Sequence, residues 1–243
     1  MNKSICIFLI WVSHWSLALA GISLDSTRYI YLGTAKAVDV VISNTASGAS
    51  RYLAWIDDGD ITVLPENAST DFFVFPPSGF LAQGRKQTVR IMYRGPVLPA
   101  DRETVRYLNV LEIPQKASPK GDQSVIAIAN RTRVKIFMRP ADMAVEPQAA
   151  AKNLVWEAGL SGATQVLKAK NASPYFVSMH TVKLMRDGTE LANLGGNMVP
   201  PWGELELRPD PKLGDLSGVT AVKYFYVNDF GGDGEVTFTL PAR

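Results

Sequence analysis

Apolar and polar residues alternate over short stretches of this chain, and turn residues separate one stretch from the next. Alternation with a period of two is the pattern of half-buried β-strands, and amphipathic helical spacing is missing. Strand-like stretches lie at 38–42, 52–56, 72–75, 87–93, 107–111, 125–137, 153–156, 165–169, 176–184, 205–207, 222–227 and 236–240. Many short strands at regular spacing predict an all-β protein made of sandwiches.

A break in the alternation divides the chain into two β domains. Residues 141–152, which follow Arg139 and Pro140, contain a proline and a run of alanines and show no strand pattern. We therefore expect an N-terminal domain at 21–139 and a C-terminal domain at 140–243.

The first 20 residues predict a cleavable export signal. Lys3 precedes the apolar run 5–12, and residues 18–20, Ala-Leu-Ala, have the small side chains of a cleavage site. Polar residues between 13 and 16 interrupt the run well before the roughly 20 apolar residues that span a bilayer. We expect cleavage after Ala20, an exported protein and no insertion into the membrane.

Few reactive side chains remain once residues 1–20 are removed. The full sequence has 25 Lys and Arg, 23 Asp and Glu, one cysteine (Cys6) and two histidines (His14 and His180). The mature chain then has no cysteine, so neither a disulfide nor a Cys–His zinc site is expected, and we predict no metal site. The small charge excess does not favour binding to nucleic acid.

Catalytic chemistry has weak support in these residues. A Ser–His or Cys–His nucleophile would need His180, which lies in the alternating stretch 177–182 and is better explained as a strand surface residue. The carboxylates of Asp101 and Glu103 are better explained as charged surface, because no partner for acid–base catalysis is evident. We expect no catalytic residues and a protein that is not an enzyme.

Residues 125–129 are apolar at every position, so this stretch has no polar face. A strand of this kind needs cover on both sides. Two interpretations remain open: the strand is buried within its own domain, or a partner covers its second face. In the second case, the basic residues of 131–135 could hold an anionic group of that partner.

Several motifs together resemble those of the periplasmic chaperones of the chaperone–usher pathway of pilus assembly. The first domain contains SLDSTR at 23–28, AWI at 54–56, LPADRE at 98–103, LN at 108–109, EIP at 112–114, RVKIF at 133–137 and RPA at 139–141. The second domain adds NASPY at 171–175 and NDFGG at 228–232. The motifs occur in this order after an export signal, and they span the whole mature chain.

The resemblance implies two immunoglobulin-like β-sandwich domains in an L or boomerang arrangement. It also implies a periplasmic protein that binds pilus or fimbrial subunits by donor-strand complementation and delivers them to an outer-membrane usher, without a cofactor. By the same resemblance, Arg28 and Lys135 would anchor the C-terminal carboxylate of the subunit.

The resemblance assigns further residues. Ile126, Ile128 and Asn130 would be the donor-strand positions whose side chains enter the subunit, although the family usually has an apolar residue where this chain has Asn130. The resemblance also implies an ion network that fixes the domain angle, formed by Glu112, Arg139 and Asp229. The short connection at 116–123 and the missing cysteine pair resemble the short-loop branch, whose clients are rod-forming or adhesive-tip pili.

An alternative class is a secreted two-domain adhesin or carbohydrate-binding module. It would explain the β domains and the export signal, but not the implied basic cleft beside the donor strand. Trp202 is the aromatic residue that would support it. Whether the free protein associates with itself to hide its donor strand is left open.

Overall fold

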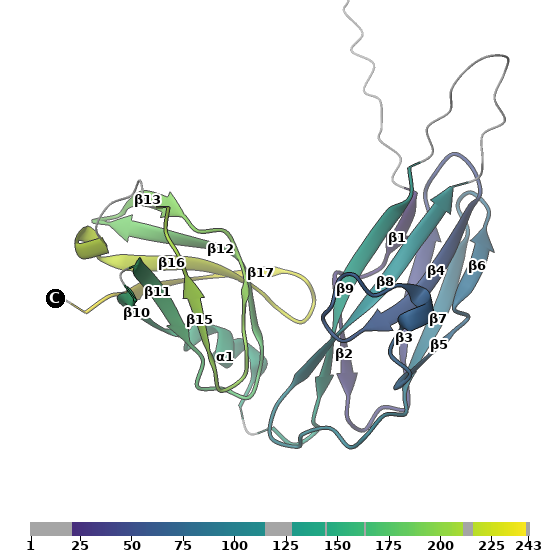
Figure 1. The fold of residues 1–243 in the computed structure, drawn as a ribbon, viewed down its shortest axis with the longest axis horizontal. Coiled ribbons are helices and arrows are strands. Elements are labelled where there is room, and N and C mark those ends of the chain that lie inside the picture. The colour runs from purple at the N-terminus through teal and green to yellow at the C-terminus, as the bar shows by residue number, and fades with distance from the viewer. Residues whose placement is uncertain (1–20, 115–127, 144, 163, 211–215, 242–243) are drawn as a thin grey trace, which may run out of the picture.

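The computed structural model describes residues 21–114, 128–143, 145–162, 164–210 and 216–241, which form two β-sandwiches (Figure 1). The first contains β1 (Ile22–Leu24), β2 (Arg28–Leu32), β3 (Val38–Asn44), β4 (Ser50–Asp57), β5 (Phe72–Phe75), β6 (Ser78–Leu81), β7 (Lys86–Tyr93), β8 (Thr104–Pro114) and β9 (Asn130–Arg139). The second contains α1 (Pro147–Lys152), β10 (Val155–Ser161), β11 (Thr164–Lys170), β12 (Val177–Arg186), β13 (Thr189–Asn193), β14 (Met198–Val199), β15 (Glu204–Leu207), β16 (Ala221–Val227) and β17 (Asp233–Thr239). The predicted all-β fold is confirmed.

Two sheets face each other in the first sandwich, in the strand orders β1-β3-β7-β5 and β2-β9-β8-β4-β6. The alternation of apolar and polar residues along the strands separates the inner face of each sheet from its outer face. Val40 and Ile42 of β3 are wholly buried between the sheets, whereas Asp39 points outward and forms an ion pair with Arg90 of β7. β-Branched side chains on the inner face suit both the extended backbone and this packing.

The chain changes sheets between β1 and β2. β1 pairs with β3, whereas β2 pairs in parallel with β9, starting with Arg28 opposite Lys135 and ending with Leu32 opposite Arg139. β8 pairs with the other edge of β9 from Asn130 to Met138. The first half of β9, from Asn130 to Val134, therefore has one edge that pairs with no strand of the described chain.

The second sandwich packs the sheet β10-β11-β15 against the sheet β13-β12-β16-β17, and β14 adds to β12. Its core includes Trp156, whose ring lies 5.4 Å from that of Tyr224. α1 occupies the stretch that showed no strand pattern. Pro147 begins this helix, where a missing N–H costs nothing, and the hydroxyl of Tyr224 donates to the carbonyl of Ala151 at 2.9 Å.

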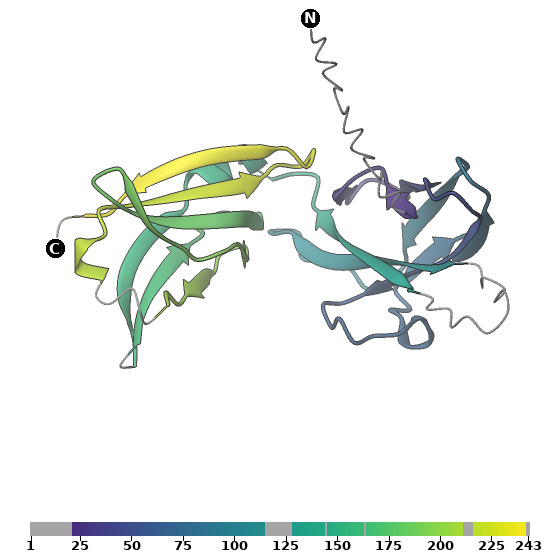
Figure 2. The same ribbon diagram turned by 90° about the horizontal axis from the view of Figure 1, so that it is seen from above.

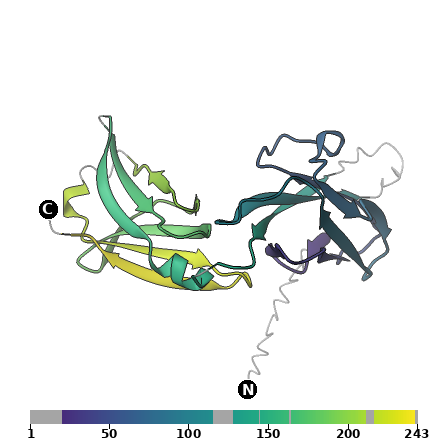
Figure 3. The same cartoon turned by 90° about the horizontal axis from the view of Figure 1, so that it is seen from below.

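The two sandwiches are joined at one end by the segment after Arg139 and are set at an angle, which confirms the predicted L arrangement (Figure 1). Views from above and below show the turn between β16 and β17 directed at the first sandwich (Figures 2 and 3). No helix in the described parts of the chain has the length and apolar character needed to cross a bilayer. The predicted signal peptide lies outside the described residues.

Candidate functional site

Two cations face each other where β2 begins. Arg28 lies directly across the parallel ladder from Lys135 of β9. Because the neighbouring Tyr29 and Ile136 point into the core, both cations lie on the outer face of the sheet. Nη1 of Arg28 donates to the carbonyl oxygen of Val227, at the end of β16 in the second sandwich, at 2.9 Å. The pair is therefore placed at the junction of the two domains.

This cation pair has no counter-ion within the described residues. Lys135 Nζ donates to Ser178 Oγ at 3.2 Å, and the buried Nε of Arg28 has no hydrogen-bond partner there. Burial, followed by the charge of Arg28, lowers the pKa of Lys135 to about 8. Burial also lowers the pKa of Arg28, although Asp229 acts in the opposite direction. Two desolvated cations without a carboxylate partner are suited to bind an anion from another molecule.

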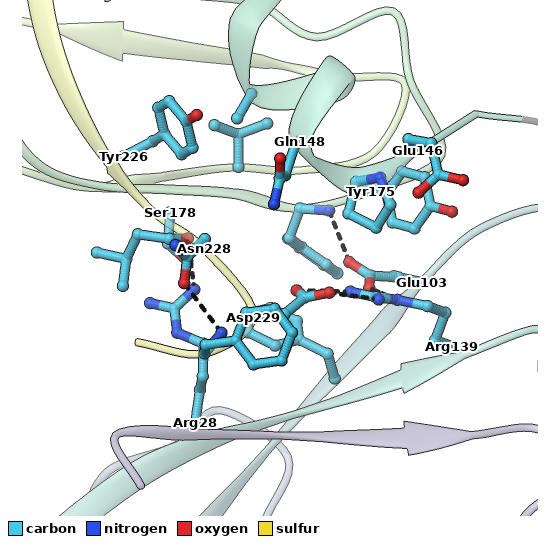
Figure 4. A pocket seen from close by; sticks show the side chains of 17 residues that line it. Arg28, Glu103, Arg139, Glu146, Gln148, Tyr175, Ser178, Tyr226, Asn228 and Asp229 are labelled. Carbon is cyan, nitrogen blue, oxygen red and sulfur yellow. Dashed lines mark hydrogen bonds and ion pairs between the residues drawn. The ribbon is translucent and has the colours of Figure 1, made fainter. Parts of the chain in front are cut away.

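Arg139, the last residue of β9, connects the two sandwiches (Figure 4). Its Nε donates to Glu103 Oε1 at 2.7 Å, and its two Nη atoms donate to the carboxylate of Asp229 at 2.6 and 2.9 Å. Glu103 is 2% exposed, and its second oxygen accepts the N–H of Phe176 at 2.9 Å. Burial raises the pKa of Glu103, and Arg139 opposes this rise. One guanidinium thus binds a carboxylate from each sandwich.

Glu112 does not belong to this network, which corrects the assignment made from the resemblance. It lies opposite Asn130, and its carboxylate accepts hydrogen bonds from Ser50 Oγ at 2.9 Å and from the N–H of Ile22 at 3.0 Å. Glu103 and Glu112 are separated by about 30 Å of extended chain, at a rise of about 3.3 Å per residue. Only Glu103, which precedes β8, lies at the end of the strand that meets the second sandwich.

Glu103 is the functional residue that the sequence reasoning assigned wrongly, because it was expected to be charged surface. The available signal was its place at the end of the LPADRE motif at 98–103. Its burial depends on contacts made by the second sandwich: besides the Phe176 N–H, the backbone N–H of Glu103 donates to the carbonyl of Pro174 at 2.9 Å. A contact between distant segments of this kind has no local pattern.

The basic residues of β9 do not act as one cluster. Arg133 forms a bidentate ion pair with Asp57, which is buried on β4. Arg131 donates to Asn109 Oδ1 and lies over the ring of Trp55, 4.9 Å from its centre. These two arginines are therefore satisfied within the first sandwich. Of the three basic side chains at 131–135, Lys135 is the one that remains available.

The donor-strand positions lie at the start of β9 and before it. Ile126 falls outside the described residues, Ile128 is 77% exposed, and Asn130 is the exposed first residue of β9. Even-numbered positions of β9 point inward, as Val134 and Ile136 show. An extension of the strand toward its N-terminus would thus carry Ile128 on the continuation of the domain's own apolar face.

Two hollows flank the cation pair. A cleft of about 400 Å³ between the sandwiches is lined by Arg28, Phe137 and Phe230, among others. Figure 4 shows Arg28 and Asp229 at this cleft. Lys135 lines a neighbouring hollow of about 440 Å³, together with Tyr107. The paired cations therefore lie between two open spaces, within reach of a group that enters from either.

The two residues that would support an enzyme or a carbohydrate-binding module, His180 and Trp202, lie in different surroundings. His180 shares the hollow of Lys135, and its ring contacts the Asp233 carboxylate at 3.3 Å and Thr181 Oγ1 at 2.9 Å. Trp202 is about half exposed in a turn and lines neither hollow. In the described ranges, no three His, Cys, Asp or Glu side chains gather as metal ligands would.

Comparisons with known proteins agree on one family. Residues 21–144 match the model of the N-terminal domain of PapD-type pili and flagellar-assembly chaperones, and residues 149–238 match that of the PapD C-terminal domain. The chain is 32% identical to the chaperone protein FimB/FhaD of Bordetella pertussis, over 88% of this chain and 86% of that protein. It is 31% identical to the probable fimbrial chaperone YadV of Escherichia coli K12, over 93% and 92%.

Solved structures resemble the whole described fold. The crystal structure of the YadV chaperone superimposes with a TM-score of 0.74 at 30% identity, covering 91% of this chain and all of that one. That of the Pseudomonas aeruginosa CupB2 chaperone gives 0.73 at 29% identity, covering 90% and 100%. The Salmonella enterica SafB chaperone, solved with the SafA pilin, shares the fold with a TM-score of 0.74 at 23% identity, covering 90% and 96%.

Proposed function

The chain belongs to the family of PapD-type pilus-assembly chaperones, and from this premise we propose that it holds a pilus subunit on the open edge of β9. The subunit contributes a strand to that edge, β9 completes the fold of the subunit, and Arg28 with Lys135 binds the subunit's C-terminal carboxylate. The observation that carries the proposal is the edge from Asn130 to Val134, which no described strand pairs with and which ends at two cations that have no counter-ion among the described residues.

The geometry also selects the direction of the incoming strand. β2 runs parallel to β9 and begins opposite Lys135, so it continues the line that the incoming strand would occupy. A strand parallel to β9 therefore ends with its carboxylate at Arg28 and Lys135. An antiparallel strand would place its cationic N-terminus there, where like charges repel. The cation pair thus favours parallel pairing.

The apolar residues before β9 would provide the contacts to the interior of the subunit. Ile128 exposes 77% of its surface in the free protein, and Ile126 precedes it at the same alternation. Burial of one such side chain contributes about 1.5–3 kcal/mol. Asn130 would meet a more polar or shallower part of the subunit, because its amide needs a hydrogen-bond partner when buried.

We further propose that this exchange occurs in the periplasm after removal of residues 1–20, and that an outer-membrane usher receives the subunit. Main-chain hydrogen bonds, apolar cover and one charge contact are sufficient for the task. The proposed function therefore needs no catalytic residue, cofactor or metal ion.

Replacement of Ile128 with Asp should greatly reduce the recovery of a fimbrial subunit that is co-produced in the periplasm and co-purified with the chaperone. The charge would have to be buried in the subunit, at a cost of several kcal/mol. The fold of the chaperone should be unaffected, because Ile128 is exposed in the free protein. The matched control is Val97→Asp, at a fully exposed apolar residue of the loop after β7. Equal recovery with both variants would contradict the role of β9.

The binding of a peptide carboxylate should weaken as the pH rises through about 8. Lys135 has a lowered pKa of about 8, so it loses its charge above that pH, and the affinity should fall up to about tenfold per pH unit. Fluorescence anisotropy between about pH 7 and about pH 9.5 measures this effect. Lys135→Arg should remove the dependence, because arginine stays protonated throughout the range. Persistence of the dependence in that variant would contradict the role of Lys135 in it.

A further inference from the structure

Phe230 is 89% exposed, yet it lines the cleft that contains Arg28. It lies in the turn between β16 and β17, the part of the second sandwich that is directed at the first (Figures 2 and 3). Its ring is not among the side chains that form the core of its own domain. An aromatic side chain left in this position is available to a molecule that enters the cleft.

The backbone around Phe230 is held in place from both domains. Asn228 Oδ1 accepts the N–H groups of Phe230 and Gly232, each at 3.0 Å. The preceding residue, Asp229, is bound through its carboxylate by Arg139. The carbonyl of Val227 accepts a hydrogen bond from Arg28. The backbone at Phe230 is therefore held relative to Arg28 by hydrogen bonds, so little backbone entropy is lost when a ligand contacts the side chain.

The carboxylate site and Phe230 open into one space. The side chain of a C-terminal residue begins at Cβ, two bonds from the carboxyl carbon, so a carboxylate at Arg28 places that side chain at the cleft. The walls on this side include Phe137 and Phe230. We propose that Phe230 contacts the side chain of the last residue of a bound subunit and selects an apolar or aromatic residue there. This inference rests on the function proposed above.

The charges around the cleft favour the same selection. Glu103, Glu146 and Asp229 all line it, and Arg139 neutralises part of this negative charge through Glu103 and Asp229. An acidic side chain would meet these carboxylates, whereas an apolar one would bury the exposed face of Phe230. Buried aromatic anchors of this kind commonly provide a large share of the binding energy in an interface.

The test uses the full mature chain and synthetic peptides of alternating Val and Ser that end in Gly, Leu, Phe or Glu, each with a free carboxylate or a terminal amide. We expect the wild type to bind the Phe- and Leu-ending acids about tenfold more tightly than the Gly-ending acid, and the Glu-ending acid more weakly still. Phe230→Ala should remove this preference, and Phe230→Leu should keep part of it. Phe80→Ala, at another exposed phenylalanine on β6, should leave it unchanged.

The outcomes separate the inference from the function on which it rests. If Phe230→Ala keeps the full preference while amides still bind more weakly than acids, the role of Phe230 is wrong and the carboxylate site stands. If amides bind the wild type as tightly as acids, or no peptide binds, the proposed function and the inference both fail. Thermal unfolding of each variant checks that its fold is intact.

Discussion

Replacement of Arg28 or Lys135 with alanine should reduce the recovery of a co-produced pilus subunit to background, while the chaperone itself remains folded. Loss of one partner from a buried charge contact typically costs about 2–5 kcal/mol, which weakens binding at least about thirtyfold. The free chaperone loses nothing comparable. The two cations have no carboxylate partner in the described chain, and the buried Nε of Arg28 is without a hydrogen bond.

Removal of the Lys135 charge should leave the free energy of unfolding of the chaperone unchanged or higher, because a desolvated like-charge pair is relieved. Arg28→Ala gains the same relief but loses the hydrogen bond to the Val227 carbonyl, so we expect a change of no more than about 1–2 kcal/mol. Urea denaturation measures this quantity, and co-purification from the periplasm measures binding. Arg51→Ala is the matched control, since Arg51 is an exposed cation on β4 of the same sheet. Normal subunit recovery from both the Arg28 and the Lys135 variants would refute the carboxylate site.

Arg139→Ala should destabilise the protein by about 3–5 kcal/mol, because it leaves a buried carboxylate without its cation. Glu103 is 2% exposed and depends on Arg139 Nε at 2.7 Å, and Asp229 loses both of its hydrogen bonds to the guanidinium. The junction between the sandwiches should also loosen. Urea denaturation measures the first effect, and small-angle X-ray scattering measures the second as a broader distribution of domain angles.

Two further variants test whether the loss of stability in Arg139→Ala comes from the unpaired buried carboxylate. Arg90→Ala removes a similarly short ion pair with Asp39, but both side chains are about half exposed to solvent, so we expect a much smaller loss of stability. Adding Glu103→Gln to Arg139→Ala should recover part of the lost stability, because the unpaired charge is then removed. If Arg139→Ala costs no more than Arg90→Ala, the ion network does not hold the domains together.

The sequence predicts those parts of the fold that depend on local patterns. Alternating positions such as Val40 and Asp39 separate the two faces of each sheet, and the break after Arg139 coincides with the end of β9. The short helix α1 was not expected, because six residues are too few to show helical periodicity. Trp55 is buried, but beneath Arg131 on the outer face of its sheet rather than between the sheets.

The candidate site could be predicted only where a resemblance supplied the spatial neighbour. Arg28 and Lys135 are 107 positions apart, and nothing local shows that they face each other across a parallel ladder. The resemblance named the wrong acid for Arg139, Glu112 instead of Glu103. The two acids lie near opposite ends of β8, and the direction of that strand decides which of them meets the second sandwich. Phe230 lies within the NDFGG motif at 228–232, but the motif does not show that its side chain is exposed at the cleft, because that exposure depends on how the hairpin is placed.

Because the chain crosses from β1 to β2, the first domain sets a fixed distance along β9 between the carboxylate site and the apolar residues before the strand. Arg28 and Lys135 form the carboxylate site at one end of this distance. Ile128 lies seven residues before Lys135, about 23 Å away at about 3.3 Å per residue. When a subunit is bound through its C-terminal carboxylate, a fixed number of its residues separates that carboxylate from the position opposite Ile128. One residue more or fewer would turn every side chain of its last strand to the opposite face. The chaperone would therefore select a subunit by which positions of its last strand are apolar, counted from the C-terminus, rather than by the particular residues at those positions.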